Sequence, residues 1–279
     1  MRTAALFPGQ GSVTAETRET LVRLRPDLYE LAVAELGHDP FERAGNGFLG
    51  QPLVYCASLA GWSRLAVERV DVVAGHSLGE LSALAAAGAI DEAEGLRLVI
   101  LRGRLMEAAE QEAGAAGGML ALRASRAAGG ALARGYGLSV AADNSPDQVV
   151  LSGDRHALEA LAHDIAAGGR DVKLLPIAGA FHSPAMESAR ERFGRALAAT
   201  PFDRPRIPVV SSVSAAPMDE PRRRLAQSLT TEVRWRETLI SLHGRGVRRF
   251  VEVGPGRVLT DLVAGAARNG HEAGWLEAA

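Results

Sequence analysis

Residues 70–88 constrain the fold most, because they place a strand, a tight turn and a helix in direct succession. Val70, Val72 and Val73 are β-branched and favour a strand, and residues 75–79 (GHSLG) form a glycine-bounded turn. The Ala/Leu-rich stretch that follows favours a helix, which Gly88 can end. This order fits a nucleophile elbow, in which flanking glycines expose a serine, here Ser77, at a helix N-terminus. The flanking strand and helix make a chance match of glycine spacing the weaker alternative.

Composition excludes several functional classes. The 279 residues carry 31 basic and 33 acidic side chains and a net charge of −2, so nothing favours nucleic acid or an anionic membrane as a partner. No uncharged apolar run reaches the roughly 18 residues of a membrane span, and the N-terminus lacks a signal-peptide pattern. The single cysteine, Cys56, excludes an intramolecular disulfide and a cysteine-rich zinc site. We expect a cytoplasmic protein without a metal site.

The pattern of elements changes at residues 113–118, a Gly/Ala-rich stretch that indicates a boundary. From there to about residue 177, short strands and helices follow the order β-α-β-β-α-β, which is typical of a ferredoxin-like unit. Longer elements lie before and after this region. We therefore expect an α/β fold in which a small ferredoxin-like α+β subdomain, residues 117–178, is inserted into a large domain formed by residues 1–116 and 179–279.

A serine nucleophile needs a base within hydrogen-bond reach, usually a histidine, and the chain has seven histidines. His76 adjoins Ser77, but adjacent side chains on a tight turn point apart, so we expect it to pack or bond locally. His182 precedes a helix that Ser183 can cap with Pro184 in its first position, so it is either the base or a capping or packed residue. The others lie in charged helices, a turn or a polar tail: His38, His156, His163, His243 and His271.

No third group that would orient the base stands out from the sequence. A carboxylate normally serves this purpose, but a backbone carbonyl is equally open as the partner of the histidine. The aspartates considered between the serine and His182 are Asp143, Asp147, Asp154, Asp164 and Asp171.

Arg102 differs from the many other arginines by its place on a helix. At 100° per residue it lies in the middle of an apolar face, whereas Arg97 and Arg104 point to the opposite, charged side. A buried guanidinium needs a partner, because an unpaired buried charge costs several kcal/mol. The partner is either a structural carboxylate or an anionic group of a substrate, gripped in bidentate fashion.

Positive charge also gathers late in the chain. These arginines are either solvated residues of an arginine-rich protein or a docking face for an acidic carrier. They are Arg222, Arg223, Arg224, Arg234, Arg236, Arg245, Arg248 and Arg249.

Six blocks of sequence, in this order, resemble the malonyl-CoA:acyl carrier protein transacylase family and the related acyltransferase domains of polyketide synthases. The resemblance covers nearly the whole chain and is specific in combination. The blocks are FPGQGS at 7–12, GHSLGE at 75–80, LRGRLM at 101–106, NSPDQVVLSG at 144–153, GAFHSPAM at 179–186 and VEVGPGRVLTDL at 251–262.

The resemblance implies a role for each matching residue. Ser77 is the acylated nucleophile, His182 its base, and the backbone N–H groups of Gln10 and Leu78 the oxyanion hole. Arg102 binds the free carboxylate of a malonyl group. The implied fold is a large α/β-hydrolase-like domain with a central, mainly parallel sheet plus the small inserted subdomain.

The implied reaction is a ping-pong transfer. Malonyl-CoA acylates the serine, and the phosphopantetheine thiol of an acyl carrier protein then removes the acyl group, without a cofactor. In the polyketide synthase domains, a phenylalanine directly before the base usually accompanies malonyl rather than methylmalonyl units, and here this position is Phe181. We expect a monomer that serves either polyketide synthesis in trans or fatty acid synthesis.

Three departures from the family's pattern bear on the site. The glycine-rich continuation after the GQG loop is replaced here by SVTAETRE, which could reshape the mouth of the site. Ser228 stands where a glutamine often orients the base, a change that is tolerable if only its main-chain carbonyl acts. The chain is also trimmed before residue 60 and at its C-terminus.

Two other functional classes compete with a malonyl transferase. A serine thioester hydrolase that removes acyl groups from carriers would use the same elbow. A non-catalytic carrier-binding module would retain the fold, but the intact Ser77, Arg102 and His182 disfavour it.

Overall fold

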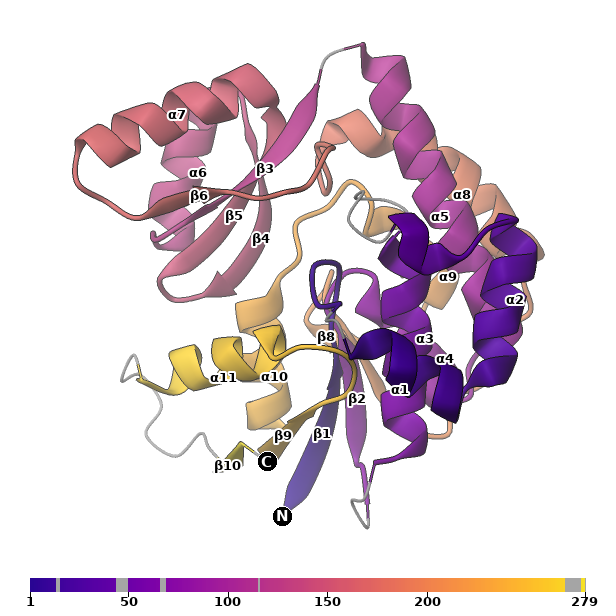
Figure 1. Ribbon diagram of the computed structural model, residues 1–279. Helices are drawn as coiled ribbons and strands as arrows, with labels where there is room; N and C mark the ends of the chain where they lie inside the picture. The colour runs from indigo at the N-terminus through magenta and orange to yellow at the C-terminus, as the bar shows by residue number, and fades with distance from the viewer. Residues whose placement is uncertain (14–15, 44–49, 66–68, 115, 269–276, 279) are drawn as a thin grey trace.

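Two separate β-sheets organise the chain in a computed structural model, which describes all residues except 14–15, 44–49, 66–68, 115, 269–276 and 279 (Figure 1). The larger sheet has six strands in the order β10-β9-β1-β2-β7-β8, and all its neighbours run parallel except β7 and β8. Its strands are β1 Arg2–Phe7, β2 Val72–Gly75, β7 Val209–Ser211, β8 Ala216–Pro217, β9 Val247–Glu252 and β10 Glu277–Ala278.

Helices cover both faces of this sheet, as the predicted large α/β domain requires. In Figure 1, α10 and α11 lie on one side of β1 and β2, and α1, α3 and α4 lie on the other. The helices outside the small sheet are α1 Thr17–Leu24, α2 Pro26–Leu36, α3 Gln51–Ser63, α4 Gly79–Ala86, α5 Glu92–Ala113, α8 Glu187–Ala199, α9 Pro221–Gln227, α10 Trp235–Gly244 and α11 Val258–Arg268, with 3-10 turns η1 Pro40–Arg43 and η3 Pro184–Met186.

The smaller sheet is antiparallel and has the strand order β4-β5-β3-β6. In the sequence, its strands and helices lie between α5 and η3. Its elements are β3 Gly117–Leu122, α6 Arg126–Gly135, β4 Ser139–Ser145, β5 Gln148–Asp154, α7 Arg155–Ala167 and β6 Val172–Leu174.

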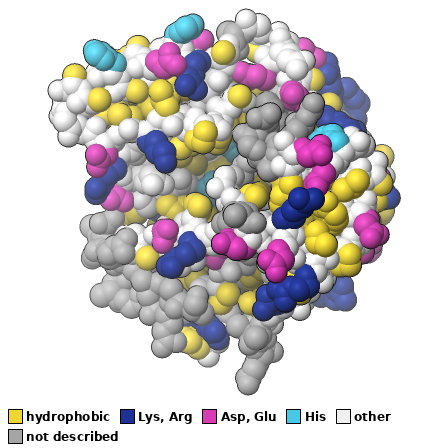
Figure 2. Space-filling model, viewed as in Figure 1, with side chains coloured by type: hydrophobic (Ala, Val, Ile, Leu, Met, Phe, Trp, Pro, Cys, Tyr) yellow, Lys and Arg dark blue, Asp and Glu magenta, His cyan; other side chains and the backbone are white. Residues whose placement is uncertain are grey.

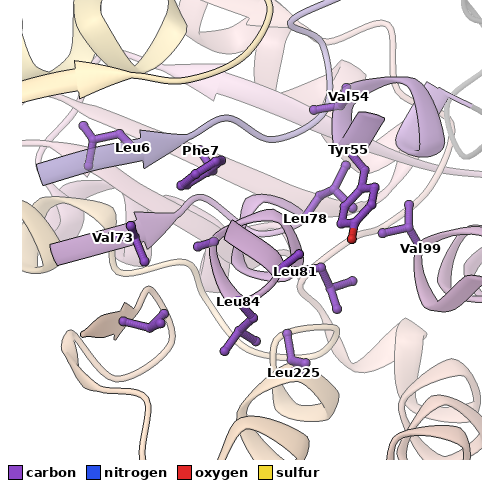
Figure 3. Close-up of a cluster of buried hydrophobic side chains, with 14 of the residues drawn as sticks. Leu6, Phe7, Val54, Tyr55, Val73, Leu78, Leu81, Leu84, Val99 and Leu225 are labelled. Carbon is purple, nitrogen blue, oxygen red and sulfur yellow. The ribbon is translucent and has the colours of Figure 1, made fainter. Parts of the chain in front are cut away.

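Each sheet has its own apolar core. The large core joins the central strands to the helix that follows Ser77: Figure 3 shows Phe7 of β1, Val73 of β2 and Leu81 of α4 in one cluster. The small core packs α7 on its sheet through residues such as Leu151 and Leu158. Because β1, β2 and α4 are held by buried contacts on every side, the turn between β2 and α4 has a rigid base.

Element lengths differ from the sequence prediction at three places, and proline accounts for two of them. Helical spacing runs through residues 16–36, but Pro26 disfavours the α conformation at the preceding Arg25, so the segment forms two helices. Residues 207–212 predict a strand, and the structure forms a shorter one, Val209–Ser211, directly after Pro208. Helical spacing also predicts a helix over residues 52–69, but α3 ends at Ser63, and residues 66–68 lie outside the described part of the chain.

Strand β4 of the small sheet pairs with the segment that precedes α10. Ala142 bridges to Val233, whose N–H donates to Ala141 and whose carbonyl accepts from Asp143, both at 2.9 Å. Asp143 also pairs with Arg236 of α10 at 2.9 Å. Within the described ranges, no helix is long and apolar enough to cross a membrane.

Candidate active site

The turn between β2 and α4 brings the backbone so close to itself that both glycines of the GHSLG motif are required. A Cβ on Gly75 would lie 1.9 Å from the carbonyl carbon of Gly79, and one on Gly79 would lie 2.1 Å from the Phe7 carbonyl oxygen. Ser77 has a φ of 53°, which L-residues rarely adopt. This strained geometry is the nucleophile elbow that the spacing predicts.

The hydroxyl of Ser77 lies 2.9 Å from Nε2 of His182, although the two residues are 105 positions apart. The other ring nitrogen, Nδ1, lies 2.6 Å from the Ser228 carbonyl oxygen and 3.2 Å from that of Thr231. A carbonyl only accepts, so Nδ1 carries the proton and Nε2 is left free to accept one from the serine.

The orienting group is therefore a pair of backbone carbonyls, one of the two arrangements left open by the sequence. The hydroxyl of Ser228 turns away and donates to the Leu225 carbonyl, so the substitution at this position leaves the contact to His182 unaffected. Asp143, the most buried of the aspartates considered, pairs instead with Arg236.

The loop that carries His182 is held by local hydrogen bonds. Ser183 donates to the Ala180 carbonyl at 2.6 Å and caps the following 3-10 turn, whose first residue is Pro184, as the sequence predicts. His182 itself has a φ of 58°. Phe181 is buried in the large core.

Arg102 reaches the same point from α5. Its Nη2 donates to the Ser77 hydroxyl at 3.2 Å, and its Nη1 donates to Oε1 of Gln51 at 2.6 Å. The side chain is buried, as the helix wheel predicts. Neither partner is a carboxylate, so among the described residues the hydrogen bonds of this guanidinium go to neutral acceptors.

Gln51 escaped the sequence reasoning. It is fully buried in the first turn of α3, where the next nine residues are buried as well. A glutamine at the start of an otherwise buried helix was the available signal, because a buried amide must find hydrogen-bond partners.

His76 points away from the serine and bonds across to the small sheet. Its Nε2 lies 2.9 Å from Oδ1 of Asn144 on β4, and its ring packs against Trp235. His76 therefore packs, as one of the two expected alternatives has it, but its hydrogen bond is long-range and not local, because the β4 strand runs past the elbow. Asn144 is thus a second residue that tertiary structure brings to the site.

Burial, and to a lesser extent neighbouring charges, shift the pKa values of groups in the site. Burial, followed by the positive charge of Arg102 and the nearby His76, lowers the pKa of His182 to about 3, while its two carbonyl partners oppose the shift. Burial raises the pKa of Glu80 to about 7, against bonds from Ser211 and Ser212. His182 is therefore neutral at physiological pH, the state in which it can accept a proton.

Two loops border the serine where an oxyanion would form. Leu78 precedes the first residue of α4, so its N–H has no acceptor within the helix. The loop after β1 packs on the elbow: the His76 N–H donates to the Phe7 carbonyl at 2.9 Å, and a Cβ on Gly9 would lie 2.9 Å from the His76 oxygen. Gln10 follows in that loop, and its role and that of Leu78 stay predictions.

The late arginines do not form one face. Arg234 pairs with Glu237, Arg223 with Glu220, and Arg222 donates to the Thr200 carbonyl. Arg248 and Arg249 lie near the start of β9, and because β9 runs parallel to β2, that end lies opposite the serine. Figure 2 shows basic and acidic side chains mixed around the hollow near the centre of this face of the molecule.

A strained serine at a strand-to-helix turn, bonded to a neutral histidine with a fixed tautomer, is the arrangement of a serine-dependent acyl-transfer enzyme. The sequence matches the acyl transferase domain family over residues 43–275. The chain belongs to this family, among the malonyl CoA-acyl carrier protein transacylases.

Individual relatives agree with this placement. The malonyl CoA-acyl carrier protein transacylase of Synechocystis is 37% identical over 94% of this chain and 92% of its own length. The polyketide biosynthesis protein ThaF of Burkholderia thailandensis is 39% identical over 93% of this chain, which spans only 24% of that protein. The malonyl-CoA:acyl carrier protein transacylase structure from Xanthomonas oryzae has a TM-score of 0.86 and 32% identity, with 96% of this chain and 93% of the other covered.

Proposed function

We propose that this chain moves a malonyl group from malonyl-CoA to the phosphopantetheine thiol of an acyl carrier protein, through an acyl-enzyme on Ser77. The observation that carries the proposal is the continuous hydrogen-bond series from Arg102 to Ser77 to His182. It joins a carboxylate-binding group to a nucleophile and its base within one buried site.

In the first half-reaction, Nε2 of His182 takes the proton of the Ser77 hydroxyl as the oxygen attacks the thioester carbonyl. The N–H groups of Leu78 and Gln10 donate hydrogen bonds to the carbonyl oxygen and stabilise the negative charge that forms on it. The carbon–sulfur bond then breaks, and the proton passes from His182 to the departing CoA sulfur. In the second half-reaction His182 deprotonates the carrier thiol, which attacks the acyl-serine, and returns the proton to Ser77.

Selection of the acyl group follows from Arg102. Its guanidinium reaches the Ser77 hydroxyl, so it can exchange this bond for a bidentate contact to the free carboxylate of a malonyl group while Gln51 holds its other nitrogen. An acetyl group offers no such partner. Phe181 directly precedes His182, and we keep the preference for malonyl over methylmalonyl that the family resemblance attaches to this position.

The proposal extends to the architecture and setting of the enzyme. The two sheets support a large α/β-hydrolase-like domain, residues 1–116 and 179–279, and a ferredoxin-like subdomain, residues 117–178. We propose that the enzyme is a cytoplasmic monomer, uses no metal or cofactor, and serves polyketide or fatty acid biosynthesis, since relatives in both groups resemble it.

Acylation with radiolabelled malonyl-CoA tests the function. We expect label on the peptide that contains Ser77, its transfer to a holo-carrier protein, and no label on Ser77→Ala. If label persists in Ser77→Ala, or if free malonate forms faster than malonyl-carrier when carrier is saturating, the transfer proposal is wrong.

A further inference from the structure

We propose that Glu110 is a positioning residue for acyl transfer, because its carboxylate holds the loop that carries His182. Glu110 lies near the end of α5, two turns beyond Arg102. The proposal rests on the proposed role of His182 as the base, and it assigns to Glu110 no contact with the substrate.

The carboxylate of Glu110 binds both segments that connect the two sheets. One oxygen accepts the N–H of Gly117, at the start of β3, and the other accepts the N–H of Ala180 at 3.2 Å. A Cβ on Gly117 would lie 2.6 Å from the Glu110 oxygen and 2.6 Å from the Ala180 nitrogen. Glycine is therefore needed at residue 117 for these three groups to meet.

Ala180 is two residues before His182, and both of its backbone polar groups are anchored. Its N–H is held by Glu110, and its carbonyl accepts the Ser183 hydroxyl at 2.6 Å. His182 has a φ of 58°, a conformation that a histidine keeps only where its surroundings hold it in place. The anchors at Ala180 supply that constraint on one side of the loop, and the Ser228 carbonyl supplies it at the ring.

Packing alone does not support the loop on this side. A partly open cavity of about 300 Å³ lies against it and is lined by Glu110, Ala180, Ser183 and Pro184. Atoms that line a cavity lack van der Waals contacts on one side, so the hydrogen bonds from Glu110 and Ser183 contribute more to holding the loop in place. Because α5 also carries Arg102, one helix fixes both the guanidinium at the serine and the loop of the base (Figure 1).

Glu110→Gln tests the role, since it keeps the shape of the side chain but replaces one accepting oxygen with an amide that faces an N–H donor. The readout is the second-order rate at which a fluorophosphonate labels the serine, which needs the Ser77–His182 pair but neither CoA nor carrier. We expect a roughly tenfold slower reaction, since small displacements of a catalytic group cost rates of this order or more. Glu112→Gln, an exposed position on the same helix that pairs with Arg192, is the matched control and should react at the parent rate.

A double-mutant cycle with His182→Ala distinguishes positioning from general loosening. If Glu110 acts through the histidine, Glu110→Gln slows labelling in the parent but adds no further loss in the His182→Ala background. An equal loss in both backgrounds, or a folded Glu110→Gln enzyme that reacts at the parent rate, overturns the proposal. Should Glu110→Gln not fold, Glu110→Asp replaces it in the same cycle with the same expected outcomes. If the parent enzyme reacts with the fluorophosphonate but transfers no malonyl group, the proposed function is refuted and the role of Glu110 is not.

Discussion

At the scale of single residues, Arg102 places a positive charge inside the site, and among the described residues neither of its hydrogen-bond partners is a carboxylate. The guanidinium of Arg102 is bonded to Gln51 and Ser77, and its charge lowers the pKa of His182. A substrate carboxylate at Arg102 would offset this charge and raise the basicity of the histidine. Under the proposed function, an acyl group without a carboxylate would leave the pKa of His182 low, so Arg102 would favour a malonyl group in the chemical step as well as in binding.

Arg102→Gln should move the acid limb of serine reactivity to higher pH. The reaction needs neutral His182, so the rate is lost as pH falls through its pKa; the parent should therefore stay reactive to about pH 5 or below, given a pKa of about 3. Removing the guanidinium takes away the second-largest cause of the lowered pKa. The pH profile of fluorophosphonate labelling measures this, and coincident acid limbs would contradict it.

Glu80→Gln should change how stability depends on pH. The pKa of Glu80 is raised from 4.5 to about 7 in the folded state, so the stabilisation it gives below about pH 4.5 is lost as pH rises through 7, by up to about 3 kcal/mol. His182 acts in the opposite sense, since its pKa is lowered and its contribution is lost as pH falls below 6.5. The difference in unfolding free energy between the variant and the parent therefore isolates the contribution of Glu80, because His182 is present in both.

Urea unfolding at about pH 5 and about pH 8 makes this comparison. We expect Glu80→Gln to gain stability relative to the parent at the higher pH. A difference that is the same at both values would mean that Glu80 is already ionised in the folded protein at about pH 5.

Sequence reasoning found the residues whose chemistry is local in the chain. Ser77 is marked by its own turn, His182 by its capped loop and Arg102 by its helix face, and the structure brings the three together. Gln51 and Asn144 were missed because their partners lie 51 and 68 positions away, and only tertiary contacts identify them.

At the scale of elements, the geometry of the strand–turn–helix unit explains why the sequence predicted the turn at residues 75–79. A backbone contact fixes each glycine, so the spacing follows from sterics rather than from local propensity. Element order was predictable, but lengths were not: Pro26 divides a stretch of helical spacing into two helices, and the strand β7 begins only after Pro208.

Gly79→Ala should destabilise the protein by at least about 3 kcal/mol, although alanine is the better helix former. Its Cβ would lie 2.1 Å from the Phe7 carbonyl oxygen, and backbone on both sides is buried. Gly135→Ala in α6 is the control, since nothing lies within 4 Å of its Cβ, and it should be neutral or stabilising by up to about 1 kcal/mol. Thermal unfolding measures both, and equal effects would exclude the backbone clash.

At the scale of the whole molecule, the site forms where the two sheets meet. The small sheet supplies Asn144 to His76, and its strand β4 pairs with Val233, two residues after the Thr231 carbonyl that faces His182. The small sheet is therefore part of the catalytic frame. Sequence reasoning expected its presence but had no pattern from which to derive its orientation.

Substituting either partner of the ion pair between Asp143 and Arg236 tests how this junction is held, because the two side chains differ in burial. The Asp143 side chain is 2% exposed and that of Arg236 is 33% exposed. Arg236→Met leaves a buried carboxylate without its cation, which costs about 3 kcal/mol or more at about pH 8. Asp143→Asn leaves an arginine that water can reach, so we expect about 1 kcal/mol.

The cost of Arg236→Met should also shrink as pH falls. Burial already raises the pKa of Asp143, and Arg236 is the largest opposing influence, so its removal raises that pKa further and lets the carboxyl take up a proton instead of remaining charged. Urea unfolding of both variants at about pH 8 and about pH 5 measures the two costs, with Arg223→Met, which breaks the exposed pair with Glu220, as a control expected within about 0.5 kcal/mol of the parent. Equal costs for Arg236→Met and Asp143→Asn at both pH values would show that the carboxylate is hydrated in the folded protein, and that the junction is held by the strand pairing at Val233 rather than by this pair.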